Sequence, residues 1–273
     1  RIPRRGLIDE TAGSASEIVA GAMQGNDRAT IIGRRSFGKG LVQQPIPFND
    51  KSMVRLTIAR YYTPSGRCIQ KPYTMGDEKS YEEDILVRYQ HGEFFSQDSI
   101  KHSGKVYHTS IGRKVYGGGG ITPDIFIPED TLNVTSYYKE ASMSGLILQF
   151  AFTYTDNNRL KLNNFSEMQE LADYLVKQNT VEKFADYANK NGLKRRNLMI
   201  KKSHKLLERY INSRIIYNML NDEAWTEYLN QDDPAIMKSL DVFKRKAAFP
   251  KKGSKNMQTS MVGMDALPMM NTG

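Results

Sequence analysis

Hydrophobic and polar residues alternate from Met53 to Tyr62, and Val54, Leu56 and Ile58 fall on one face of this segment. A period of two is typical of a half-buried β-strand. The next residues, Thr-Pro-Ser-Gly at 63–66, are turn formers that close the strand. The alternation therefore predicts a sheet in the first half of the chain.

Shorter patterns around this strand complete a mixed region of helix and sheet. A helix is expected over residues 17–24, and short strands are expected over 29–32, 41–44 and 124–128. The strand at 41–44 is followed by Pro45, which we expect to end it. Residues 74–112 are polar without a clear period and predict a long irregular excursion.

The second half of the chain changes to a helical period. Ser166 and Gln169 have the spacing of a capping box, and apolar residues follow at 168, 171, 172, 175 and 176. Further helices are expected over 181–188, over 197–218 and from Pro234, which suits a first helical position. The residues from Pro250 onward are expected to form a disordered tail.

These patterns predict a fold class and a division of the chain. We expect an α/β region with a mixed β-sheet and helices at residues 1–135, followed by an α-helical region at 136–248. Residues 249–273 form the expected disordered tail.

Composition narrows the classes of protein that fit. With 273 residues and 39% hydrophobic residues, the chain can build a core, and it contains no apolar run long enough to cross a membrane. The net charge of +9 allows a nucleic-acid binder. However, the basic clusters at 194–196, 201–202 and 244–246 lie in helical patterns, and no nucleic-acid-binding motif accompanies them, so no nucleic-acid partner is expected.

A glycine-flanked lysine at position 39 raises the first question of chemistry. Gly33, Gly38 and Lys39 have the spacing of a phosphate-binding loop. Such a loop needs a serine or threonine after the lysine and a helix next, because the phosphates bind at the helix N-terminus. Here Gly40 follows the lysine and a strand is expected next, so the sequence argues against a nucleotide site.

Lys39 can instead act as a base if burial removes its charge. A lysine has an ordinary pKa of about 10.4, and several units of depression are needed for it to accept a proton at neutral pH. Such a base needs a hydroxyl group to activate. Ser14 and Ser16 begin the expected helix, where free amides and the helix dipole assist a nucleophile. Taken alone, Ser14 and Glu17 also fit a simple capping box.

Together the two segments resemble the carboxy-terminal processing peptidases, the tail-specific serine proteases with a Ser–Lys dyad. The nucleophile motif is Ser-Ala-Ser-Glu-Ile at 14–18, and the base motif is Ser-Phe-Gly-Lys-Gly-Leu-Val-Gln at 36–43. The segments at 55–70 and 117–125 also match. The resemblance covers most of residues 7–130, which it identifies as part of a catalytic core. The remaining helices resemble an extension found in some members.

The resemblance implies a role for each matched residue. Ser14 becomes the nucleophile, Lys39 the general base and Gln43 the residue that orients Lys39, while the amide of Ala15 is an oxyanion donor. Residues 39 and 43 would share one face if both lay on a strand. The implied reaction is acyl transfer through an acyl-enzyme, without a cofactor or a metal.

The resemblance also implies a substrate class and a location. Members cleave proteins near their C-termini, often at apolar tails, in the bacterial envelope on its periplasmic side. This chain shows no signal peptide of its own, and its oligomeric state does not follow from the sequence.

The chain departs from the family in how little precedes Ser14. Members carry a PDZ domain and glycine-rich strands before the nucleophile, and these strands supply a second oxyanion amide. Only 13 residues come before Ser14 here, so the chain is expected to be the C-terminal portion of a longer peptidase. The alternative is a truncated, inactive relative that acts as a protein-binding module.

Overall fold

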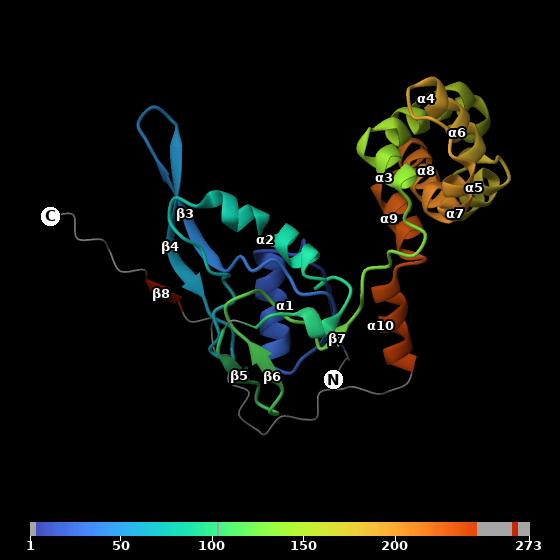
Figure 1. The fold of residues 1–273 in the computed structure, drawn as a ribbon. Coiled ribbons are helices and arrows are strands. Elements are labelled where there is room, and N and C mark those ends of the chain that lie inside the picture. The colour runs from blue at the N-terminus through green and yellow to red at the C-terminus, as the bar shows by residue number, and fades with distance from the viewer. Residues whose placement is uncertain (1–3, 103, 245–263, 267–273) are drawn as a thin grey trace. The chain divides into compact units, whose positions relative to one another are not determined.

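The computed structural model describes residues 4–102, 104–244 and 264–266 and divides into two compact units (Figure 1). The first unit contains Arg1–Glu129 and Pro234–Gly273, and the second contains Asp130–Asp233. The first unit mixes strands and helices, whereas the described elements of the second are all helical. The predicted fold class, α/β followed by an α-helical region, is therefore confirmed.

A small parallel sheet forms the centre of the first unit. Its order is β1 (Arg5–Ile8), β2 (Thr30–Gly33) and β7 (Ile125–Phe126). Helix α1 (Ala15–Gly25) makes the crossover between β1 and β2, which parallel strands require. Six buried apolar side chains pack between sheet and helix: Ile8, Ala20, Ala29, Ile31, Ile69 and Ile121. This packing fixes the start of α1 beside the loop after β2.

A long antiparallel hairpin of β3 (Leu41–Pro47) and β4 (Met53–Tyr61) extends from this unit (Figure 1). Strand β8 (Met264–Ala266) pairs with the other side of β4. Strand β3 continues past Pro45, contrary to the prediction, because it is an edge strand where proline loses no pairing partner. The predicted strand at β4 is confirmed, but its expected burial was wrong, since Val54, Leu56 and Ile58 are all exposed.

The predicted irregular excursion contains regular elements, so that prediction was wrong. Helix α2 (Glu78–Gln90) has Asp77 as its N-cap, whose side chain accepts from the amide of Ser80. The short helix η1 (Gln97–Ser99) and a hairpin of β5 (Val106–His108) and β6 (Lys114–Tyr116) follow. Helix α2 escaped prediction because it is largely polar and buries a charged residue, Arg88, in place of an apolar stripe.

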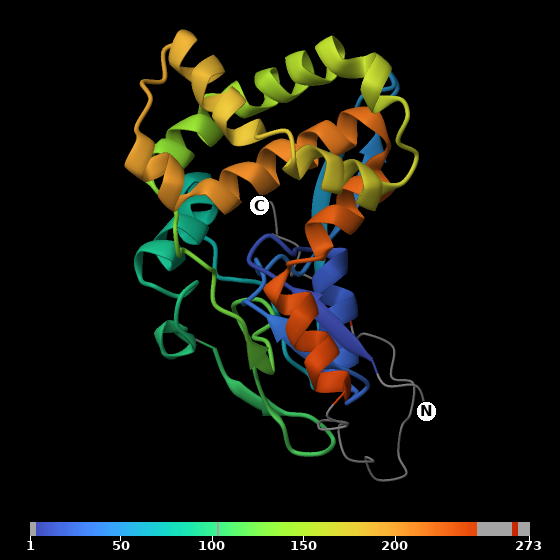
Figure 2. The ribbon, with the colours of Figure 1, turned by 90° about the vertical axis from the view of Figure 1, so that its right-hand side faces the viewer.

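Helix α10 (Pro234–Lys244) belongs to the first unit although it comes late in the chain. It lies against β1 and β2 (Figure 2), and the guanidinium of Arg5 lies 4.6 Å from the ring centre of Phe243. Its start at Pro234 agrees with the predicted helix. Most of the expected tail at 249–273 lies outside the described residues.

The second unit is a helical bundle with its own core. Its elements are α3 (Ser136–Met143), α4 (Leu146–Leu162), α5 (Met168–Val176), α6 (Thr180–Lys190), α7 (Asn197–Lys202), α8 (His204–Met219) and α9 (Asp222–Asn230). Tyr137, Leu171 and Phe184 are among its fully buried residues. In the part of the chain that the structure describes, no helix is both long and apolar enough to cross a membrane.

Two details of the predicted helices were wrong. The capping box at Ser166 is absent, because the N-cap of α5 is Glu167 and Gln169 donates to Asp173 instead. The single helix expected over 197–218 is interrupted at Ser203, which separates α7 from α8. The buried Ser203 hydroxyl bonds to the carbonyl of Met199 at 2.7 Å and to the hydroxyl of Thr135, also at 2.7 Å.

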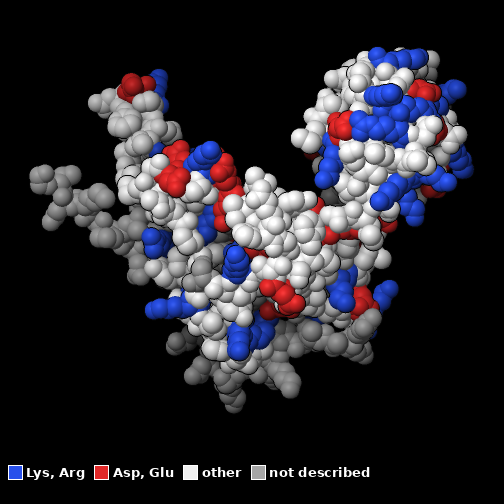
Figure 3. Space-filling view, viewed as in Figure 1, with Lys and Arg blue, Asp and Glu red and all other residues white. Residues whose placement is uncertain are grey.

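Basic side chains are prominent on the surface of the helical unit (Figure 3). Arg195 forms ion pairs with Glu182 and Asp186, and Arg196 pairs with Glu140. The positive charge of this segment is thus partly neutralised by its own helices, which is typical of a solvated face.

Candidate active site

Ser14 lies at the start of α1 in a backbone conformation that serine seldom adopts. Its φ is 56° and its ψ is −117°. A positive φ at a residue other than glycine is uncommon and is concentrated at functional sites. The capping box that the sequence indicates is present, since Glu17 accepts from the Ser14 amide, and the Ser14 hydroxyl is exposed.

The amide of Ala15 is the first of α1 and is available to a ligand. The neighbouring amide of Ser16 donates to the carbonyl of Gly13, and that of Ile18 donates to the carbonyl of Ser14. Among the described residues, the Ala15 amide has no acceptor. An unpaired amide at a helix N-terminus, next to a serine hydroxyl, is the geometry that an oxyanion needs.

Glu17, three residues after Ser14, connects the serine to the loop between β2 and β3, residues 34–40, which contains Lys39 and is called the lysine loop below. Its carboxylate is fully buried. One oxygen, Oε2, accepts from the amide of Ser14 at 3.1 Å and from the amide of Lys39 at 2.7 Å. The other, Oε1, accepts from the amide of Gly38 at 2.7 Å and from the hydroxyl of Ser36 at 2.5 Å. The main chains of Ser14 and Lys39 therefore meet at one carboxylate oxygen.

The loop from β2 to β3 is shaped by glycines at close approaches. Gly33 has a φ of 130°, and a Cβ there would lie 1.9 Å from the carbonyl oxygen of Ile8. Gly38 has a φ of 95°, which turns its amide toward Glu17. Since the amides of Gly38 and Lys39 both donate to Glu17, they are not free to hold a phosphate. This geometry agrees with the argument against a nucleotide site.

Ser36 connects this loop to the segment before β7. Its hydroxyl donates to Glu17 and accepts from the amide of Ile121 at 2.7 Å, and its own amide donates to the carbonyl of Ile121 at 3.1 Å. Ser36 is fully buried. The lysine loop is therefore held from two sides through a single hydroxyl.

Helix α2 supports the lysine loop from outside through a buried ion cluster. Arg88 donates to the carbonyls of Arg35 at 2.6 Å and Ser36 at 3.0 Å, and both arginines pair with Glu93. Burial alone would raise the pKa of Glu93, but the hydrogen bonds and charges of Arg35 and Arg88 outweigh it and lower this pKa below its ordinary value.

Lys39 itself is half-buried just before β3 begins at Leu41. Within the described residues, its ammonium forms no ion pair with an aspartate or glutamate.

Gln43 lies in β3 and is exposed, and its side-chain amide donates to the hydroxyl of Thr57 at 3.4 Å. No hydrogen bond joins it to Lys39 within residues 4–102 and 104–244. The argument from a shared strand face does not apply, because Lys39 precedes β3 and a bulge lies between Val42 and Gln43. The orienting role of Gln43 stays a prediction.

Sequence reasoning missed the part that Glu17 and Ser36 play. Both stand inside the motifs that were singled out, and the spacing of Ser14 and Glu17 indicated a cap. The cap is in part real, since Glu17 does accept from the Ser14 amide. The local pattern could not indicate the hydrogen bond from the Lys39 amide to Glu17, because only the crossover between β1 and β2 brings Lys39 to Glu17.

An open apolar cavity of about 740 Å³ begins beside the candidate nucleophile. Ala15, Ser16 and Val19 of α1, Leu7 of β1 and Phe243 of α10 are among the residues that line it. Val19 is 63% exposed. In the described part of the chain, no group of three or more His, Cys, Asp or Glu side chains is placed to hold a metal ion.

Comparison with known proteins finds similarity to two protein families. Residues 2–80 match the model of peptidase family S41. Residues 137–221 match a family of unknown function, DUF8443.

Individual proteins are similar to parts of this chain. A carboxy-terminal-processing protease of Bartonella bacilliformis is 61% identical over 64 residues, which cover 23% of this chain and 15% of the relative. A probable CtpA-like serine protease of Staphylococcus epidermidis is 29% identical over 192 residues, which cover 67% of this chain and 33% of the relative. A solved photosystem II D1 C-terminal processing protease is 26% identical, with a TM-score of 0.28, over 48% of this chain and 22% of that one. This chain spans a third or less of the curated relatives described here.

Proposed function

We propose that this chain carries the nucleophile and the base of a serine endopeptidase that cleaves proteins near their C-termini. The observation that carries the proposal is the shared hydrogen bonding of Ser14 and Lys39 to Glu17, which brings the two matched motifs together. The match of residues 2–80 to the model of a peptidase family supports it.

The proposed reaction is acyl transfer in two steps. The Ser14 hydroxyl attacks a peptide carbonyl while neutral Lys39 accepts its proton, and the amide of Ala15 stabilises the oxyanion. Lys39 then gives the proton to the leaving amine, and an acyl-enzyme remains on Ser14. In the second step Lys39 takes a proton from water, which attacks the ester and releases the product. Gln43 is proposed to orient Lys39.

The proposed substrates are proteins with apolar C-terminal tails. The cavity beside Ala15 supports this choice, because Leu7, Val19 and Phe243 offer an apolar surface to an extended segment. No cofactor enters the proposed reaction. We propose the periplasmic side of the bacterial envelope as its location.

Intact-protein mass spectrometry after incubation with a fluorophosphonate probe tests the proposal. One probe adduct is expected on Ser14, and it should be absent in Ser14→Ala and Lys39→Ala. Ser16→Ala is the matched control, because Ser16 is also exposed on the first turn of α1 and should leave the labelling unchanged. An adduct that persists in Ser14→Ala would refute the assigned nucleophile.

A protein-binding module is the second candidate function. The exposed apolar face of β4, formed by Val54, Leu56 and Ile58, favours it, since such faces often mark interaction sites. A chain that circular dichroism shows to be folded, but that takes up no probe, would support this function over the catalytic one.

A further inference from the structure

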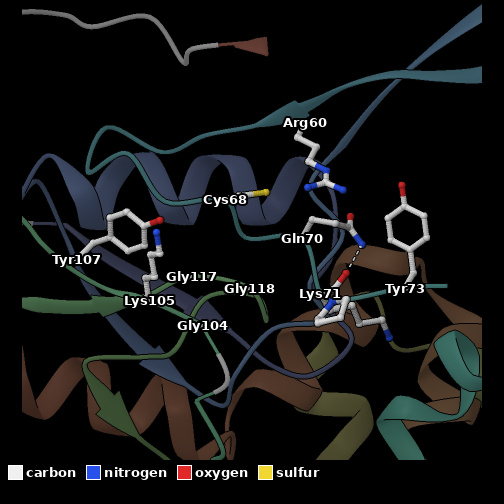
Figure 4. Close-up of a pocket in the computed structure, with 11 residues that line it drawn as sticks. Arg60, Cys68, Gln70, Lys71, Tyr73, Gly104, Lys105, Tyr107, Gly117 and Gly118 are labelled. Atoms are coloured by element: carbon white, nitrogen blue, oxygen red, sulfur yellow. Dashed lines mark hydrogen bonds between the residues drawn. The ribbon is translucent and has the colours of Figure 1, made fainter. Parts of the chain in front are cut away.

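A second cavity, of about 340 Å³, opens in the first unit at the end of β4 (Figure 4). Arg60 of β4, Cys68, Tyr73, Lys105 and Tyr107 are among the residues that line it. None of the residues in the proposed catalytic site lines this cavity. An inference about it therefore stands apart from the peptidase proposal.

The lining of this cavity is basic. Three of its residues are arginine or lysine, and none is aspartate or glutamate. The ammonium of Lys71 is already engaged, since it donates to the carbonyl of Tyr81 at 2.7 Å and pairs with Asp84 at 3.3 Å. The two remaining cations, Arg60 and Lys105, have no ion-pair partner among the described residues.

Arg60 is the more informative of the two cations. It is half-buried, and its Nε is a buried donor without an acceptor in the described part of the chain. Figure 4 shows its guanidinium group over the same space that the sulfur of Cys68 faces. A buried N–H without a partner is unfavourable, and a guanidinium matches the planar geometry of an oxyanion.

The walls of this cavity are held in place before any ligand arrives. The amide of Gly118 donates to the carbonyl of Cys68 at 2.8 Å, and that of Gly117 donates to the carbonyl of Lys105 at 3.1 Å. The side chain of Gln70 accepts from the amide of Gly40 at 2.8 Å and donates to the carbonyl of Lys71 at 2.9 Å, the dashed line in Figure 4. A ligand would therefore meet a formed site.

We propose that this cavity binds a small oxyanion, a phosphate or carboxylate group, between Arg60 and Lys105. Arg60 supplies the guanidinium contact and Lys105 a second positive charge at the rim. Tyr73 and Tyr107 also line the cavity, and a tyrosine hydroxyl can donate a hydrogen bond. The two sources of such a group are free inorganic phosphate and the C-terminal carboxylate of a peptide.

The reaction rate of Cys68 reports on this cavity directly, because it is the only cysteine of the chain. The probe reactions are disulfide exchange with the dianionic 5,5′-dithiobis(2-nitrobenzoate) and with the neutral 4,4′-dithiodipyridine, at constant ionic strength. Inorganic phosphate is expected to slow both reactions in a saturable way. Arg60→Gln should abolish this protection and reduce the preference for the dianionic reagent about tenfold, as loss of a focused positive charge implies.

Arg55→Gln is the matched control, because Arg55 is an exposed arginine of the same strand, and its protection by phosphate should equal that of the unchanged chain. Lys105→Gln is the second test variant. Because Lys105 is exposed, this variant should fold, and it tests the anion site if Arg60→Gln does not fold. It should weaken protection several-fold.

Alanine dipeptides with a blocked N-terminus distinguish a peptide carboxylate from free phosphate as the source of the oxyanion. Protection by the dipeptide with a free carboxylate, but not by its C-terminal amide, would assign the cavity to peptide ends. Protection by phosphate alone would assign it to the free anion. Either result supports an oxyanion site. Equal protection in the unchanged chain, Arg60→Gln and Lys105→Gln, or no protection by either anion, would overturn the proposal.

Discussion

At the scale of the residue, the candidate active site depends on how one carboxylate is shared. Glu17 is buried, yet the donors around it are three backbone amides and one hydroxyl, none of them a charged group. Amides can satisfy a buried carboxylate when several converge on it. The Glu17 side chain thereby holds the start of α1 and the lysine loop together.

Replacing Glu17 by glutamine tests this arrangement at constant size. One carboxylate oxygen becomes an NH₂ group that faces donors, so at least one buried donor loses its acceptor. We expect the free energy of unfolding to fall by about 1–3 kcal/mol, and fluorophosphonate labelling of Ser14 to fall further than this loss explains. Urea unfolding followed by circular dichroism measures the first quantity, and mass spectrometry measures the second.

Glu78→Gln is the control for this substitution, since Glu78 is exposed on α2. It should change the free energy of unfolding by less than about 0.5 kcal/mol. Unchanged stability and labelling in Glu17→Gln would show that the shared carboxylate does not position Ser14 and Lys39.

At the scale of the element, α2 shows why a helix can act on a site without being visible in the sequence. Its contribution is the ion cluster of Arg88 with Glu93 and Arg35, which supports the carbonyls of the lysine loop. A polar helix of this kind has no apolar period to detect. Its docking depends on charge, and therefore on pH.

The low pKa of Glu93 predicts the direction of that dependence. Because the pKa is lower in the folded chain than in the unfolded chain, the ionised carboxylate stabilises the fold above its ordinary pKa, near 4.5. This stabilisation is lost as the pH falls through that value and below. The free energy of unfolding, measured in urea between pH 7 and pH 3, should decline in the unchanged chain.

Glu93→Gln should remove part of this pH dependence. At pH 7 it should lower the free energy of unfolding by about 3 kcal/mol, because both arginines lose a buried partner. Glu83→Gln, on the exposed side of α2, is the control and should keep the original slope. The same slope in Glu93→Gln would mean that other carboxylates account for acid sensitivity.

Particular elements also show how far the sequence could predict this fold. The half with strands, the helical half and the start of α10 followed from periodicity and from Pro234. The continuation of β3 past Pro45 could not be predicted from periodicity, because a proline is tolerated there only since β3 is an edge strand. The break at Ser203 could not be predicted either, since the buried Ser203 hydroxyl contacts Thr135, which is far away in the sequence.

The candidate site was predictable only as two separate motifs. Ser14, Ala15, Lys39 and Gln43 were named from local patterns and a family resemblance. Glu17 could be named as a cap, but its link to Lys39 needs the tertiary path of the chain. The same holds for Arg88, which reaches the carbonyl of Ser36 across 52 positions of sequence.

At the scale of the whole molecule, segments of the two units match different family models. Residues 2–80 match a peptidase family, whereas 137–221 match a family without a described function. Each unit has its own buried core. The site, the apolar cavity and the basic cavity all lie in the first unit, so the proposals concern that unit alone.

The uncovered apolar face of β4 has a consequence for how the molecule behaves in solution. A net charge of +9 makes copies repel one another at low ionic strength, while Val54, Leu56 and Ile58 offer them a surface on which to associate. Salt shortens the range of the repulsion to about 8 Å at physiological strength and leaves the apolar attraction intact. The colloidal stability of the chain should therefore decrease as sodium chloride is added, which static light scattering would detect. Leu56→Lys should remove most of this salt response.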